Sequence, residues 1–309
     1  MKRCALLLAG FVLLVACGSE PAPGPQAQRA RADDFPASID AANGRVVLRA
    51  RPERVVSLSP TATEMLFAVD AGDQVVAVDD NSDYPARAPT TNLSGYEPNL
   101  EAIASYEPDL VVLSDDTAGT VEALQRLSIP VIVHPAATGL RDVYAQIQQL
   151  GQATGNSGEA TAVVERMRAR IRATVSSAPE VVPAPTYYHE LDPFFFSVTS
   201  DTFIGRVYGL LGLRNIADGA KGAGSGYPQL SAEHIIESDP DLIFLADTKC
   251  CGMTPAKVAD RPGWGRLTAV EAGGVFELDD DVASRWGPRI VEFAATVARA
   301  VERLEGAPR

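Results

Sequence analysis

Glu101-Ala-Ile-Ala-Ser-Tyr-Glu-Pro-Asp-Leu-Val-Val-Leu-Ser-Asp115 has a similar second copy in the chain. The second copy lies 132 residues further along, aligns with the first without a gap and reads Glu233-His-Ile-Ile-Glu-Ser-Asp-Pro-Asp-Leu-Ile-Phe-Leu-Ala-Asp247. Each copy has the pattern of a short helix, a Pro-Asp turn and a fully apolar strand that ends in Asp, which is half of an α/β unit. The spacing is far longer than that of a solenoid repeat, so it indicates two similar lobes and not a stacked array.

Both copies begin with a glutamate, Glu101 in the first and Glu233 in the second. Two lobes of one design would present these carboxylates at equivalent places, facing a partner that is itself two-fold symmetric. The alternative is that each glutamate only complements the positive N-terminal end of its own helix. The spacing alone leaves both interpretations open.

Apolar runs alternate with helical patterns along the rest of the chain, and strands this apolar are typical of a parallel sheet covered on both faces. We therefore expect an α/β fold of two Rossmann-like lobes with central parallel sheets, over residues 46–152 and 181–309. Residues 153–180 are rich in helix-forming residues and predict one long backbone helix that joins the lobes. A ligand would lie between the lobes, where the carboxyl ends of the strands converge.

The expected elements follow from the same patterns. Strands are expected at 54–59, 74–79, 109–115, 130–134, 186–191, 215–218, 241–247 and 274–278, and helices at 61–69, 99–106, 120–127, 156–176, 202–213, 231–237 and 288–304.

The N-terminus has the pattern of an export signal. Two basic residues precede an apolar run of about half the ~20 residues that a membrane-spanning helix needs, which predicts a signal peptide over residues 1–16. The sequence Leu14-Val-Ala-Cys17 resembles a bacterial lipobox, so Cys17 is expected to carry lipid and hold the chain on the extracytoplasmic face of the cell membrane. An ordinary cleavage site is the alternative. Residues 17–45 are rich in Pro, Ala, Gln and Gly and predict a disordered tether.

Charge and cysteine content restrict the possible partners. The chain carries a net charge of −13. Loss of the two basic residues of the signal would make it more acidic still, which argues against nucleic acid as a partner. After processing, only the adjacent Cys250 and Cys251 remain. They can form a vicinal disulfide or stay free thiols; metal ligation ranks last, because the three histidines share no ligand-type spacing with the pair.

Five stretches, read together, resemble the cobalamin and ferric-siderophore binding proteins of ABC importers, a vitamin B12-binding-protein-like class whose lobes are bridged by one helix. They are Arg54-Val-Val-Ser-Leu-Ser-Pro-Thr-Ala-Thr-Glu64, Asn81-Ser-Asp-Tyr-Pro85, Asn99-Leu-Glu101, Tyr227-Pro-Gln-Leu-Ser-Ala-Glu233 and Ser284-Arg-Trp-Gly-Pro-Arg289. The resemblance implies a monomeric substrate-binding lipoprotein that delivers a corrinoid (cobalamin, vitamin B12) to a homodimeric ABC permease with its ATPase. It also implies that Glu101 and Glu233 dock on that permease.

The resemblance implies a ligand site of aromatic faces and a few polar groups. It comprises Tyr84, Tyr96, Phe195, Phe196, Tyr227, Asp281, Arg285 and Trp286. Such a set suits a large, flat, amphipathic ligand. Structural interpretations stand beside it: Tyr84 could serve a turn before Pro85, the Phe194–Phe196 run could be packing, and Trp264 could lie under the last helix. Tyr96 is one position away from the family's tryptophan, and the Cys250–Cys251 loop departs from the pattern.

Other functions are weighed against this one. A ferric siderophore or haem would call for several cationic groups, and Lys249, Arg285 and Arg289 are the candidates. A tethered ligand sensor would use the same site. An extracytoplasmic α/β enzyme is disfavoured, because the sequence has no Gly-x-Ser-x-Gly elbow and no recognisable triad. We expect no catalytic residue, no metal and no cofactor.

Overall fold

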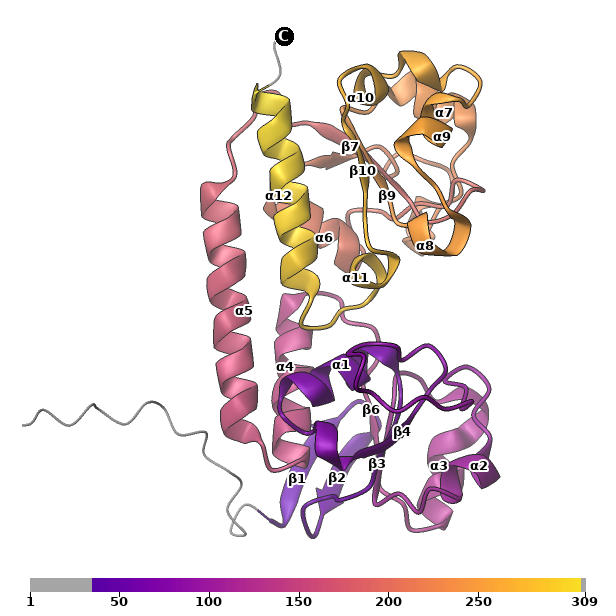
Figure 1. The fold of residues 1–309 in the computed structure, drawn as a ribbon, viewed down its shortest axis with the longest axis vertical. Coiled ribbons are helices and arrows are strands. Elements are labelled where there is room, and N and C mark those ends of the chain that lie inside the picture. The colour runs from indigo at the N-terminus through magenta and orange to yellow at the C-terminus, as the bar shows by residue number, and fades with distance from the viewer. Residues whose placement is uncertain (1–34, 307–309) are drawn as a thin grey trace, which may run out of the picture.

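The computed structural model describes residues 35–306 and shows two α/β lobes placed one above the other along the long axis, with long helices on one side (Figure 1). Each lobe contains a four-stranded sheet of parallel strands. The predicted fold class is confirmed: two Rossmann-like lobes are joined by one long helix, α5 (Ser157–Ser177).

The N-terminal lobe has the sheet order β4-β3-β5-β6. All residues of β3 and β5 are buried, which is why these strands read as continuous apolar runs. Its elements are β1 (Ala37–Ala41), β2 (Gly44–Leu48), β3 (Val55–Leu58), α1 (Pro60–Ala68), β4 (Val75–Val78), α2 (Leu100–Ala104), β5 (Leu110–Leu113), α3 (Thr120–Arg126), β6 (Val131–Val133) and α4 (Leu140–Ala153).

The C-terminal lobe has the sheet order β10-β9-β7-β8. Its elements are β7 (Thr186–Glu190), α6 (Phe203–Leu210), β8 (Arg214–Asn215), α7 (Ala232–Ser238), β9 (Leu242–Leu245), α8 (Thr248–Cys251), α9 (Pro255–Ala259), α10 (Thr268–Glu271), β10 (Val275–Glu277), α11 (Asp280–Ser284) and α12 (Ile290–Gly306). The duplicated phrase therefore folds twice in the same way, as α2 and β5 in one lobe and as α7 and β9 in the other.

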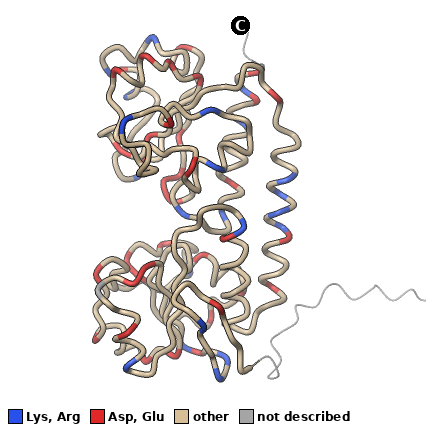
Figure 2. Tube along the Cα trace, turned by 180° about the vertical axis from the view of Figure 1, so that it is seen from behind, with Lys and Arg blue, Asp and Glu red and all other residues tan. Residues whose placement is uncertain are grey.

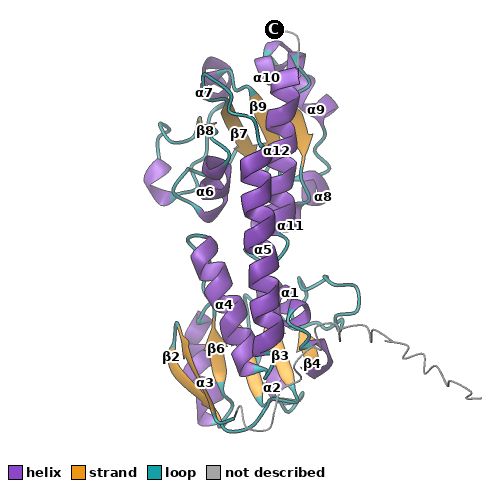
Figure 3. Ribbon diagram, turned by 90° about the vertical axis from the view of Figure 1, so that its left-hand side faces the viewer, coloured by secondary structure: helices purple, strands orange, loops and turns teal. Residues whose placement is uncertain are grey.

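The joining helix α5 does not stand alone. It packs against α4 of the N-terminal lobe and α12 of the C-terminal lobe, so that three helices form the spine seen in Figure 3. Buried apolar residues of α5, among them Val163 and Met167, belong to one core cluster that continues into both lobes. Because bending the spine would break this packing, the fold holds the two lobes at a nearly fixed separation.

Two sequence-based expectations need correction. The tether expected over residues 17–45 is wrong for its last part, because β1 and β2 pair there as an antiparallel hairpin. The signal was present in the sequence: Asn43-Gly44 is a strong hairpin turn, and Gly44 has a positive φ of 104°. Helix α4 was not predicted at all. The signal peptide, Cys17 and the rest of the tether lie outside the described residues.

Trp264 also differs from expectation. It does not lie under the last helix, α12, but is fully buried in a separate core cluster, where its ring contacts Tyr188 edge-on and stacks on Phe195. This cluster fills the space between the C-terminal sheet and the short helices α9 and α10. Trp264 is therefore a structural residue of that lobe.

Candidate functional site

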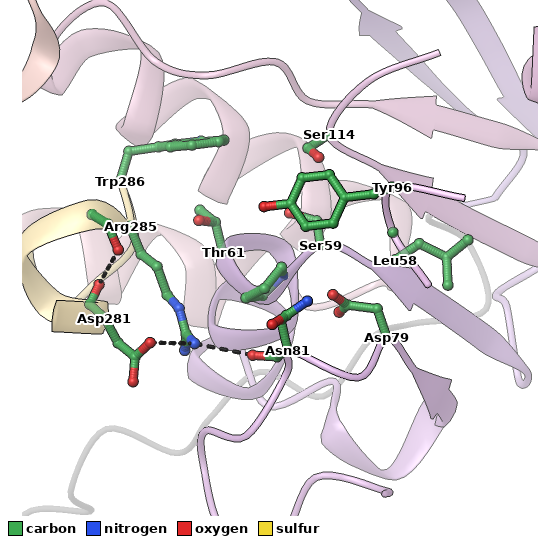
Figure 4. Close-up of a pocket in the computed structure, with 13 residues that line it drawn as sticks. Leu58, Ser59, Thr61, Asp79, Asn81, Tyr96, Ser114, Asp281, Arg285 and Trp286 are labelled. Atoms are coloured by element: carbon green, nitrogen blue, oxygen red, sulfur yellow. Dashed lines mark hydrogen bonds and ion pairs between the residues drawn. The ribbon is translucent and has the colours of Figure 1, made fainter. Parts of the chain in front are cut away.

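A pocket of about 280 Å³ lies between the two lobes and takes its walls from both (Figure 4). The N-terminal lobe contributes the residues that follow the carboxyl ends of β3, β4 and β5, and the C-terminal lobe contributes α11 and the two residues after it. The lining residues are Leu58, Ser59, Pro60, Thr61, Asp79, Asn81, Gly95, Tyr96, Ser114, Asp281, Ser284, Arg285 and Trp286.

The N-terminal wall follows from the parallel sheet, whose strands all end at the edge that faces the other lobe. Ser59 caps α1, since its hydroxyl accepts the backbone amide of Ala62 at 3.3 Å. Gly95 approaches β3 so closely that a β-carbon there would lie 2.8 Å from the Leu58 carbonyl oxygen. This close approach places Tyr96 at the pocket with its side chain 79% exposed.

Asp79 is a buried carboxylate in this wall. Burial raises its pKa, and the hydrogen bond donated by the Ser82 hydroxyl partly offsets that rise. The serine belongs to a short network, because Ser82 and Thr63 also share a hydrogen bond of 2.9 Å. The wall is thus polar and already hydrogen-bonded, with Asn81 beside it.

The C-terminal wall is built by α11. Asp279 caps this helix by accepting the backbone amides of Asp281 and Val282, and the helix then directs Asp281, Arg285 and Trp286 toward the other lobe (Figure 4). The indole of Trp286 reaches across and donates a hydrogen bond of 3.0 Å from Nε1 to Oε1 of Gln146 on α4.

Two arginines of the C-terminal lobe converge on one buried glutamate of the N-terminal lobe. Glu64, whose side chain is 2% exposed, accepts Arg285 Nη1 at 3.0 Å and Arg289 Nε at 2.9 Å. Arg285 also bonds Asp281 at 2.7 Å and Asp83 at 3.1 Å. We call Glu64, Arg285 and Arg289 the interlobe latch. The hydrogen bonds to Glu64 raise the pKa of Arg289 above its usual range, which keeps this arginine charged.

The structure brings together four of the residues predicted to bind ligand: Tyr96, Asp281, Arg285 and Trp286 all line the pocket. Tyr84 does not. Its ring lies 4.1 Å from the guanidinium carbon of Arg289, beside the latch, and precedes a cis proline. Arg285 lines the pocket, but its hydrogen bonds go to carboxylates and to the Asn81 carbonyl oxygen.

The remaining predicted aromatic residues lie on loops of the C-terminal lobe outside this pocket. The run 194–196 follows β7, and Phe195 takes a positive φ of 66°. Its ring therefore packs on Trp264 while Phe194 stays 70% exposed. Phe196 pairs with Gln229 in a β-bridge, which holds this loop beside exposed Tyr227. The loop after β7 leaves the C-terminal sheet at the same edge as α11, so these residues lie on the edge of the lobe that also supplies the pocket wall.

Several residues of the site were not identified from the sequence. Glu64 stands in α1 among apolar, buried residues, and a carboxylate in such surroundings signals a buried ion pair. No comparable signal marks Ser59, Thr61, Asp79 or Ser114. They are ordinary polar residues that become part of the pocket only because parallel strands end together.

The two repeated glutamates are both exposed, each in the first turn of its helix: Glu101 in α2 and Glu233 in α7. Both helices lie on the side of the molecule away from α5 (Figure 1). Hydrogen bonds from its own backbone amide and from Ser231 lower the pKa of Glu233. Acidic residues are spread over both lobes, whereas α5 carries a row of arginines (Figure 2).

A buried charge cluster lies at the carboxyl edge of the C-terminal sheet. Glu190 is fully buried and receives two hydrogen bonds of 2.6 Å from Arg261. Asp247, the last residue of the second repeat, is also fully buried, and neither of its carboxylate oxygens has a hydrogen-bond partner among residues 35–306. Burial, followed by the negative charge of Glu190, raises the pKa of Asp247 to about 7.

Asp247→Asn is expected to stabilise the protein at alkaline pH. The folded state holds a proton on Asp247 up to about pH 7, whereas the ordinary carboxyl pKa is 3.8, so stability is lost as pH rises through this window. The variant should raise the free energy of unfolding by on the order of 4 kcal/mol at pH 8 and by much less at pH 4. Urea unfolding of both proteins at the two pH values measures this. An equal difference at both pH values would contradict it.

Cys250 and Cys251 are joined by a disulfide on α8. Among residues 35–306, no group of three or more histidine, cysteine or acidic side chains is arranged to hold a metal ion. Within the same residues, no helix combines the length and apolar character needed to cross a bilayer.

Comparison with known proteins gives consistent results. A family model described as periplasmic binding protein matches residues 55–282. A cobalamin-binding protein of Halobacterium salinarum is 33% identical over 96% of this chain and 83% of its own length. An uncharacterized ABC transporter substrate-binding lipoprotein of Bacillus subtilis is 28% identical over 96% and 95% of the two chains. A periplasmic heme-binding protein from Roseiflexus has the same fold, with a TM-score of 0.71 and 23% identity over 81% of this chain and 97% of its own.

Proposed function

Because this chain belongs to the periplasmic binding protein family, and is thus the substrate-binding protein of an ABC importer, we propose that its substrate is a corrinoid held between the two lobes. The family is one of solute-binding proteins and not of enzymes. The ligand would enter the pocket of Tyr96, Asp281 and Trp286 and extend over the exposed rings of the C-terminal lobe.

The observation that carries the proposal is the combination of exposed aromatic rings with a pocket in which the described residues offer no unpaired cation. Tyr96 on one lobe and Tyr227 on the other are exposed at the carboxyl edges of their sheets. Of the described residues that line the pocket, Arg285 alone is cationic, and Glu64, Asp83 and Asp281 already pair with it. A neutral or cationic macrocycle with amide side chains fits these surroundings, because the rings bind its apolar faces and carboxylates accept its amide protons.

The same features weigh against the anionic alternatives. A haem or an anionic ferric siderophore is best held by unpaired arginines or lysines. Lys249, the other candidate, pairs with Asp279 and Asp281 at 2.8 Å each. The relative from Halobacterium salinarum that carries a cobalamin-binding name also shares more of its sequence with this chain than the heme-binding neighbour does.

The transport role includes two further proposals. Cys17 would carry the lipid that holds the protein on the extracytoplasmic face of the membrane, and the Bacillus subtilis relative named as a lipoprotein supports this. Glu101 and Glu233 would contact arginines of a homodimeric permease, one glutamate from each lobe. Their equivalent positions on α2 and α7, with the spine fixing the distance between the lobes, support such a two-point contact.

Calorimetric titration of the full-length protein in detergent tests the choice of ligand. Cyanocobalamin, haemin and the ferric hydroxamate ferrichrome would be added separately under the same conditions. Cyanocobalamin is expected to bind with one molecule per chain, and the other two much more weakly. Tight binding of haemin or ferrichrome without binding of cyanocobalamin would overturn the corrinoid assignment and leave the binding-protein family unaffected.

A further inference from the structure

The Cys250–Cys251 disulfide lies on an exposed turn next to the interlobe pocket. Both cysteines are exposed, and they end the four-residue helix α8, which follows β9 at the carboxyl edge of the C-terminal sheet. Helix α8 packs against α11, the helix that supplies Asp281 and Arg285 to the pocket. The disulfide is therefore open to solvent and one helix away from the latch.

One carboxylate fixes the backbone of this turn. Asp280 on α11 accepts the backbone amides of Thr248 at 2.8 Å, Lys249 at 3.0 Å and Cys250 at 2.9 Å. It also accepts the hydroxyl of Thr248 at 2.8 Å. These bonds exist only while the turn keeps the conformation in which its first three amides point the same way, which is the conformation of α8 with the disulfide closed.

The side chain of Lys249 links the turn to the latch. Its ammonium group bonds Asp279 and Asp281, each at 2.8 Å, and these bonds outweigh the effect of burial and raise the pKa of Lys249. Asp281 in turn bonds Arg285 at 2.7 Å, and Arg285 bonds Glu64 of the other lobe at 3.0 Å. The three consecutive aspartates at the start of α11, Asp279 at its cap and Asp280 and Asp281 in its first turn, thus connect the disulfide to the interlobe contact.

We propose that Cys250–Cys251 is a thiol-exchange site whose oxidation state controls the interlobe latch through Lys249 and the aspartates of α11. A thiolate of an external dithiol attacks one sulfur, the S–S bond breaks and a mixed disulfide forms. The second thiolate of the dithiol then displaces the cysteine, so the reagent leaves as a disulfide and both cysteines take up protons as thiols. Two electrons and two protons pass to the protein.

Reduction opens the ring that joins the two adjacent residues, and the backbone of the turn gains conformational freedom. The amides of Lys249 and Cys250 then separate from Asp280, and the ammonium of Lys249 no longer holds Asp281 in place. Arg285 loses one of its ordered partners, although Glu64 remains. The pocket wall formed by α11 becomes more mobile as a result. This inference rests on the contacts around the latch and does not depend on which ligand the protein carries.

Hydrogen exchange followed by mass spectrometry tests the proposal on the full-length protein in detergent, with and without dithiothreitol. Reduction should expose two additional thiols and speed exchange about tenfold in peptides that cover residues 248–252 and 280–286. Peptides from α5 should exchange unchanged. The double variant Cys250→Ser/Cys251→Ser should show the fast exchange in both conditions and no response to dithiothreitol.

A further variant tests the link from Lys249 to the latch separately from the reduction of the disulfide. Lys249→Met, which retains the disulfide, should speed exchange at 280–286 and leave the two thiols masked until dithiothreitol is added. Failure of dithiothreitol to release the thiols would overturn the exchange site. Release of the thiols with unchanged exchange at 280–286 would overturn the connection to the latch. Because neither readout uses a ligand, a failure of cyanocobalamin to bind would leave both results interpretable.

Discussion

Replacing Glu64 by alanine is expected to lower the free energy of unfolding by about 3–5 kcal/mol, because it leaves the partly buried guanidinium of Arg289 without a carboxylate and removes one of the three carboxylates that pair with Arg285. The side chains of Arg285 and Arg289 are only 11% and 13% exposed, so water cannot fully replace the lost partner. The loop between the two arginines is also fitted to Glu64: a β-carbon on Gly287 would lie 3.3 Å from its Oε2 atom. Urea unfolding of the wild type and the variant measures the loss.

An exposed ion pair provides the matched control. Glu122 and Arg126 form an i,i+4 pair on α3 whose side chains are largely exposed. Glu122→Ala should therefore cost no more than about 0.5 kcal/mol. Glu64→Gln keeps the shape of the side chain and removes its charge. Its loss in the free energy of unfolding should therefore lie between those of Glu64→Ala and Glu122→Ala. If Glu64→Ala costs no more than Glu122→Ala, the latch contributes nothing to the joining of the lobes.

Removing both repeated glutamates is expected to abolish most transport while ligand binding stays intact. In the double variant Glu101→Ala/Glu233→Ala, uptake of labelled cyanocobalamin by cells that carry the altered gene should fall by about tenfold or more, because charged contacts at an interface rim govern orientation and the rate of association. Calorimetric titration of the purified variant should match the wild type, since neither residue lines the pocket.

Two other exposed glutamates on neighbouring surfaces serve as the control for this experiment. Glu122 lies on α3 and Glu237 on α7, and both are exposed. The variant Glu122→Ala/Glu237→Ala removes the same amount of charge and should retain normal uptake. Equal loss of uptake in both double variants would point to net charge, and normal uptake in the first would contradict docking through α2 and α7.

Much of the fold was predictable because it depends on local patterns. Strands buried on both faces must be apolar throughout, so β3, β5 and β9 stood out in the sequence, and the duplicated phrase fixed the equivalence of the lobes. The hairpin β1–β2 is hard to predict, because the Pro- and Ala-rich composition of residues 17–45 is typical of a disordered segment and the Asn43-Gly44 turn is a short signal within it. Composition describes a whole segment, whereas a hairpin needs only a few residues.

The candidate site was less predictable because its contacts join residues far apart in the chain. Asp281 and Arg285 were identified, but the pairing of Arg285 with Glu64, 221 positions away, depends on how the lobes face each other. Phe195 was expected to face ligand. The backbone conformation at this residue directs its ring onto Trp264 instead, and nothing in a run of three phenylalanines reveals which one turns inward.

The central claim, that the ligand is bound by aromatic faces on both sides of the gap between the lobes, is tested most directly by one comparison of affinities. Cyanocobalamin would be titrated into the wild type, into Tyr96→Ala/Tyr227→Ala, and into Leu127→Ala as a control at an exposed residue outside the pocket. Loss of two stacking contacts of about 1 kcal/mol each predicts roughly 30-fold weaker binding in the double variant and no change in the control. Equal affinity in all three proteins would contradict the claim.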